Sequence, residues 1–121
     1  MKIYSDRYET DTETDQAIAH MERCRQSGRP FFLCVAPHPP HPPFDAPFLP
    51  EGYLEQVPEK IWWEPNLPAD SPQADLAMRG YLAMVKNLDD NLGRLLDYLD
   101  SHPGQNGAGS SHRLSRNASA R

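Results

Sequence analysis

The sequence predicts an α/β fold, in the form of one buried strand with helices on either side of it. The strand is indicated by FFLCVA, residues 31–36, which is apolar at every position rather than at alternate ones. That pattern is typical of a strand covered on both faces, as in a parallel sheet. Amphipathic patterns before and after this run predict the helices, and 121 residues suffice for one core.

A short helix is expected before the strand. It should begin near Thr14, because the preceding Thr and Asp residues can cap free backbone N–H groups and acid favours the positive end of the helix dipole. Ala17, Ile18 and Met21 then fall on one face, and Gly28 ends the helix.

A longer helix is expected from about Pro72 to Ser101, with Ser71 as its cap. Its apolar stripe alternates spacings of four and three, through Tyr81, Val85, Leu88, Leu92, Leu95 and Leu99. Gly80 and Gly93 lower helix propensity, so we expect another backbone to approach closely at both.

Between these elements lies a long loop, because twelve of the thirteen prolines fall between Pro30 and Pro72. Residues 1–103 therefore form the predicted body, and residues 104–121, without periodicity or acid, a disordered or aberrant tail. The strand has no clear partner apart from KIY near Met1, so the body resembles a piece of a larger sheet.

Charge and composition exclude several partners. The formal net charge of −5 and the lack of a basic stripe argue against nucleic acid, and no apolar run or leader indicates a membrane. Cys24 and Cys34 are predicted to be buried thiols rather than a disulfide, which leaves the compartment undetermined.

Two histidines, His38 and His41, lie among prolines directly after the predicted strand, in PHPPHPPF. Three hypotheses remain open: a zinc site, a P-x-x-P ligand for a peptide-binding domain, and one imidazole beside an anionic substrate. A straight polyproline segment would hold the two backbones about 9 Å apart, too far for one zinc ion. The structural alternative is that His38 binds no ligand and only hydrogen-bonds its own loop.

Three motifs in order resemble the sulfatases, which belong to the alkaline phosphatase superfamily. RPFFLCVAPHPPHPPFDAPFLPEGY resembles their P-F-F-L strand and P-H-x-P-F loop, WEPNLP their P-P-N-x-P turn, and YLAMVKNLDDNLGRLLDYLD a later helix. The resemblance is to arylsulfatase-like members of the family and spans about Tyr4 to His102. It implies an alkaline-phosphatase-like sheet, a formylglycine nucleophile made from cysteine, a calcium ion, and a sulfated small molecule or glycan as substrate.

The resemblance also implies a role for one histidine. His41, in PHPPF, matches the family histidine that contacts sulfate or the bridging oxygen, whereas His38 matches less well. The family's C-x-P-S-R motif, its early aspartate pair and its S-D-H-G motif are not found. Cys24, in CRQSG, is therefore not assigned as the nucleophile, and Asp89 and Asp90 point about 100° apart and are not assigned as metal ligands.

We therefore expect an internal fragment of a sulfatase catalytic domain, a sulfuric ester hydrolase by resemblance. It would supply a substrate-side histidine and be inactive alone, with no catalytic or metal-binding residue assigned. One alternative is a phosphomonoester or phosphonate hydrolase of the same superfamily. Another is a non-enzymatic proline-rich interaction module, which would need Pro39, Pro40 and Pro42 exposed.

Overall fold

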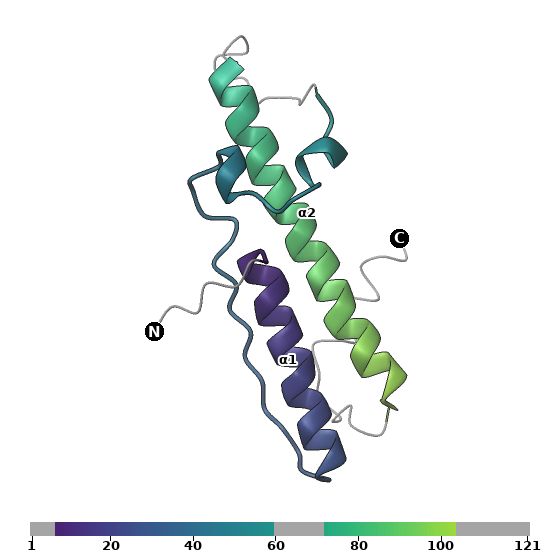
Figure 1. Cartoon of the computed structure of the whole chain (residues 1–121). Coiled ribbons are helices and arrows are strands. Elements are labelled where there is room, and N and C mark those ends of the chain that lie inside the picture. Colours follow the sequence, from purple (N-terminus) through teal and green to yellow (C-terminus); the bar gives the residue numbers. More distant parts are fainter. Residues whose placement is uncertain (1–6, 60–71, 104–121) are drawn as a thin grey trace.

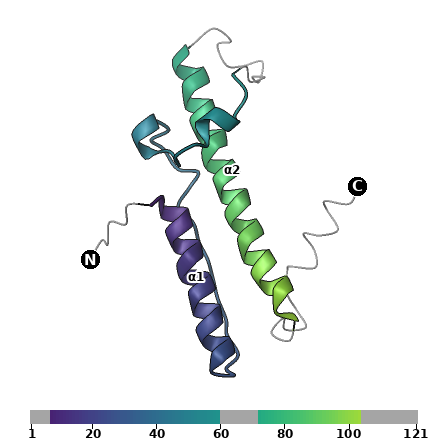
Figure 2. The same cartoon turned by 45° about the vertical axis from the view of Figure 1, so that its right-hand side comes forward.

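A computed structural model describes residues 7–59 and 72–103 of the chain (Figure 1). Two long helices, α1 (Glu9–Gln26) and α2 (Pro72–Ser101), lie side by side and run in the same direction. Two short 3-10 helices, η1 (Ala46–Phe48) and η2 (Leu54–Gln56), belong to the segment that joins them. After α1 the chain returns along this helix in extended form (Figures 1 and 2).

Helix α1 begins at Glu9, earlier than predicted, and ends as predicted. Thr14 lies inside it and is buried, so it contributes to packing instead of capping. At the other end Gly28 has a φ of +65°, where a side chain would be strained. The N–H groups of Gly28 and Arg29 donate to the Arg25 and Cys24 carbonyls at 3.1 and 2.9 Å, which closes the last turn.

The interface between the helices is centred on one carboxylate. The buried amides of Asn87 and Asn91 both donate through Nδ2 to Asp11 Oδ1, at 3.0 and 2.6 Å. Further along, the Tyr98 hydroxyl donates to Glu22 Oε2 at 2.7 Å. Polar contacts therefore run the length of the α1–α2 contact.

The face of α2 that α1 covers is not the predicted apolar stripe. The buried residues of α2 are Gly80, Ala83, Met84, Asn87 and Asn91. On the stripe, by contrast, the exposed fraction is 50% for Leu92 and 38% for Tyr81, and the other four residues are only partly buried. The bonds to Asp11 fix the rotation of α2 about its axis. The buried small residues and asparagines of α2 therefore pack toward α1, and the apolar stripe does not face α1.

The predicted α/β fold is wrong for the part of the chain that the structure describes, which is helical and contains no strand. Residues 31–36 are extended but form no backbone hydrogen bond with described residues. Their exposure alternates, with Leu33 and Val35 partly covered and Phe32 93% exposed. A strand needs a neighbouring backbone to pair with, and this segment lies against a helix, whose backbone groups are already bonded.

Several expectations concern residues outside the described ranges: the Ser71 cap, the WEPNLP turn, and the tail from residue 104. The start of α2 at Pro72 and its end at Ser101 agree with the prediction. Among the described residues no helix is long and apolar enough to cross a membrane.

The two glycines of α2 differ in their surroundings, and this gives a matched test. A Cβ on Gly80 would lie 2.3 Å from the Phe44 carbonyl oxygen, whereas a Cβ on Gly93 would meet open space. We expect Gly80→Ala to lower the free energy of unfolding. Gly93→Ala should raise it by about 0.5–1 kcal/mol, because alanine has the higher helix propensity. Urea unfolding of both variants measures this, and equal effects would contradict the close contact at Gly80.

The carboxylate between the helices should be equally sensitive. Asp11→Ala removes the acceptor of the buried Asn87 amide, and an unpaired buried donor costs about 1–3 kcal/mol. Glu9→Ala, at an exposed position on the same first turn, should change the free energy of unfolding by less than about 0.5 kcal/mol. Urea unfolding checks both values, and a neutral Asp11→Ala would argue against the polar bridge.

Candidate functional site

The two histidines predicted from the sequence lie together. The rings of His38 and His41 are stacked, with centroids 4.6 Å apart and planes at 15°. Bends at Pro40 and Pro42 interrupt the loop, so the straight polyproline spacing predicted from the sequence is wrong here. The loop therefore presents a pair of imidazoles, both exposed.

A backbone carbonyl fixes the tautomer of His41. Its Nδ1 lies 2.6 Å from the Pro42 carbonyl oxygen, and a carbonyl can only accept, so Nδ1 carries the hydrogen. Nε2 is then the ring nitrogen available to a ligand, as an acceptor in the neutral ring and as a donor when protonated. The structural alternative predicted a hydrogen bond between His38 and its own loop. A bond of this kind is found at His41 instead.

One acidic residue that was not predicted, Glu13 of α1, is near enough to His38 to interact with it electrostatically. Burial and the nearby Glu9 raise the pKa of Glu13, and His38 opposes them. Its Oε2 is buried and has no hydrogen-bond partner. No motif in the sequence points to Glu13, because its proximity to His38 depends on the return of the chain along α1.

Glu13 also lines a cleft of about 270 Å³ between α1 and the extended segment. His20, Cys34 and Val35 contribute to the same cleft. Among these groups the imidazole and the thiol can carry polar chemistry, and the remaining wall is largely apolar. The cleft is thus a mixed surface and does not concentrate positive charge.

The cysteines differ from the sequence prediction in part. Both are free, but Cys34 is exposed, so the prediction of a buried thiol is wrong for this residue. Cys24 is partly buried, and its Sγ lies 3.7 Å from His20 Nε2, one turn earlier on α1. The expected strand would have covered Cys34 on both faces, and the observed segment covers only alternate residues.

The described residues do not fit the groups that the sulfatase resemblance implies. Within residues 7–59 and 72–103, no three His, Cys, Asp or Glu side chains converge to hold a metal ion. Cys24 sits inside a helix beside His20, in a segment without the expected proline and arginine. We therefore derive no step through calcium or formylglycine from this chain.

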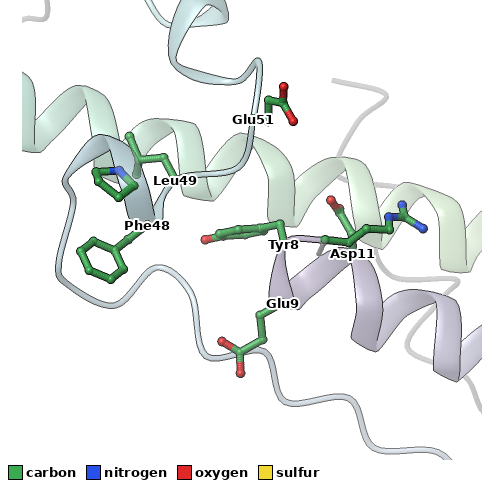
Figure 3. A pocket seen from close by; sticks show the side chains of 8 residues that line it. Tyr8, Glu9, Asp11, Phe48, Leu49 and Glu51 are labelled. Atoms are coloured by element: carbon green, nitrogen blue, oxygen red, sulfur yellow. The ribbon is translucent and has the colours of Figure 1, made fainter. Parts of the chain in front are cut away.

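A larger recess, of about 540 Å³, lies at the start of α1 (Figure 3). The ring of Tyr8 reaches toward the loop that carries Phe48, and Glu9, Asp11 and Glu51 also line the recess. The lining thus carries three carboxylates against the guanidinium of Arg7, which is paired with Asp15, so its net charge repels a sulfate or phosphate group. This recess is thus the larger one but not the candidate site for an anion.

Comparisons with known proteins bear on the family. A family model described as Sulfatase matches residues 2–107, which is most of the chain. The chain therefore belongs to the sulfatase family, whose chemistry is the hydrolysis of sulfate esters. Searches of curated proteins and of solved structures found no match.

The recess supplies a pH prediction. Burial and the carboxylates of Glu9 and Asp11 raise the pKa of Tyr8 to about 12, from an ordinary value of 10.0. The unfolded chain therefore loses this proton first as the pH rises, and the contribution of Tyr8 to stability, complete below pH 10, is lost toward pH 12. We expect Tyr8→Phe to lessen the fall of the free energy of unfolding in this window. An identical pH dependence in both proteins would contradict the shift.

Proposed function

We propose that the chain is part of a sulfatase-type catalytic domain, residues 1–103, and that His41 is its substrate-side residue. The observation that carries the proposal is His41 itself: it occupies the PHPPF motif inside the segment matched by the family model. It is exposed, and its Nδ1 is held by a carbonyl. A protonated Nε2 can donate to a sulfate oxygen, where a positive charge also stabilises negative charge that develops as the ester bond breaks.

The role assigned to His41 is binding and charge stabilisation, without nucleophilic attack. No described residue is assigned as a nucleophile, and the described residues do not assemble a metal site. We therefore expect this chain alone to bind a sulfate group weakly and to show no turnover of a sulfate ester. Calcium and formylglycine belong to the full-length family and are not assigned to residues of this chain.

One alternative from the sequence loses support from the burial of the prolines. A P-x-x-P ligand needs an accessible face, but Pro39 is buried and Pro40 partly buried, while Pro42 alone of the three is exposed. The other alternative, a phosphomonoester or phosphonate hydrolase of the same superfamily, needs the same anion-binding histidine. Sulfate and phosphate must therefore be compared directly.

The test is an imidazole ¹⁵N NMR titration of the chain with inorganic sulfate at about pH 6, with inorganic phosphate in parallel. We expect Nε2 of His41 to shift on addition of sulfate, and His41→Ala to weaken binding at least about tenfold, the loss of one hydrogen bond to a charged group. His102→Ala is the matched control, because His102 Nδ1 also lies against a backbone carbonyl, 2.8 Å from Tyr98 O.

Three outcomes would count against the proposal. Equal weakening by His41→Ala and His102→Ala would mean nonspecific attraction of the anion. A response to phosphate alone would favour the phosphate-hydrolysing alternative. Hydrolysis of 4-nitrophenyl sulfate by the chain, lost in His41→Ala, would show that it is active alone and that the binding role is too narrow.

A further inference from the structure

The imidazole of His41 has two contacts within its own loop. Its Nδ1 donates to the Pro42 carbonyl at 2.6 Å, and its face lies against the ring of His38, with centroids 4.6 Å apart and planes at 15°. This separation is within the range of stacked aromatic pairs. The hydrogen bond restrains one atom of the ring and the stack restrains its plane, so together they determine the direction of Nε2.

The backbone that carries the two rings is itself held in place. Pro39, which follows His38, is buried, and Pro40 is partly buried. Just after the pair, Phe44 packs edge-on against Tyr81 of α2, with ring centroids 5.9 Å apart, and its backbone meets Gly80. The stack is therefore a contact between two side chains on a restrained backbone, and it needs no second chain.

We propose that His38 is a positioning residue for His41: its ring holds the His41 imidazole in the orientation that presents Nε2 to a sulfate oxygen. This inference rests on the proposed function, in which His41 is the substrate-side residue, and adds a second residue to it. Ordering a mobile side chain on binding costs free energy, and a contact that orders it beforehand removes that cost. His38 thus raises the affinity for an anion without touching the anion.

The surroundings of the two histidines support this division of roles. Burial and Glu9 raise the pKa of Glu13, and His38 opposes them, so His38 and the Glu13 carboxylate interact electrostatically. An ionised Glu13 would repel an anion placed at His38. His41, by contrast, is exposed and keeps Nε2 for a ligand, because its Nδ1 is bonded to the carbonyl. The stack therefore joins one ring suited to bind an anion with one ring suited to support it.

Two substitutions separate the ring face of His38 from its charge. His38→Ala removes the face, whereas His38→Phe keeps an aromatic ring and removes the nitrogens. In an imidazole ¹⁵N NMR titration of the full 121-residue chain with inorganic sulfate at about pH 6, we expect His38→Ala to weaken binding about two- to tenfold, the cost of ordering one side chain. His38→Phe should bind sulfate within about twofold of the unsubstituted chain, because the stack is kept.

The orientation of the ring can also be measured without any anion. At about pH 8, where an ordinary imidazole is neutral, ¹⁵N shifts report which ring nitrogen carries the hydrogen. We expect His41 to carry it on Nδ1 in the unsubstituted chain and in His38→Phe, and to shift toward the Nε2–H form in His38→Ala. His102 is the internal control, because its Nδ1 also lies 2.8 Å from a carbonyl and its ring stacks on Tyr98 at 4.4 Å.

The outcomes separate the role of His38 from the proposed function. If His41→Ala weakens sulfate binding but His38→Ala changes neither affinity nor tautomer, the positioning role is wrong and the proposed function stands. A His38→Phe variant as weak as His38→Ala would overturn the inference, since the charge of His38 would then act instead of its face. Equal changes at His41 and His102 would overturn it too, because they would place the effect in the helices. If the unsubstituted chain does not respond to sulfate, the proposed function fails and the role of His38 fails with it.

Discussion

The carboxylate of Asp11 is the constraint on which the arrangement depends. Because Asn87 and Asn91 are one helical turn apart, two bonds to the same oxygen set both the height of α1 along α2 and the rotation of α2. Few other packings of the two helices are compatible with these buried amides, since an unpaired donor is costly away from water. A polar contact of this kind specifies one packing, where an apolar stripe would allow several. It therefore decides which face of α2 meets α1 and which one turns outward.

The packing of α1 against α2 also determines the position of the proline loop. The chain leaves α1 through the turn at Gly28 and runs back along this helix, so the loop returns toward the start of α1. Its far end is held where the Phe44 backbone meets Gly80, a contact that only a residue without Cβ permits. With both ends fixed, the two imidazoles between them are presented on a short, bent segment. The site is thus positioned by helix packing and one glycine.

Local signals in the sequence predicted what local physics determines. The limits of α2 and the end of α1 follow from proline, glycine and periodicity, and they were predicted correctly. The strand at residues 31–36 was not, because an apolar run reports burial, whereas a strand also requires a partner backbone. The close approach at Gly80 was predicted correctly, but the one at Gly93 was not, since helix propensity does not say what lies outside the helix. Likewise the periodicity of α2 gave an apolar face but not the identity of its neighbour.

In the candidate site too, the sequence motif predicts one residue and the fold adds another. The contacts of the two histidines also bear on which of them would bind an anion. The motif selected His41, and only the fold places Glu13 near His38. The imidazole of His38 lowers the pKa of Glu13 against the effects of burial and Glu9, so the two groups attract each other when charged. A sulfate at His38 would compete with that carboxylate, whereas His41 uses Nδ1 for a carbonyl and keeps Nε2. These contacts support the proposal that an anion binds His41 in preference to His38.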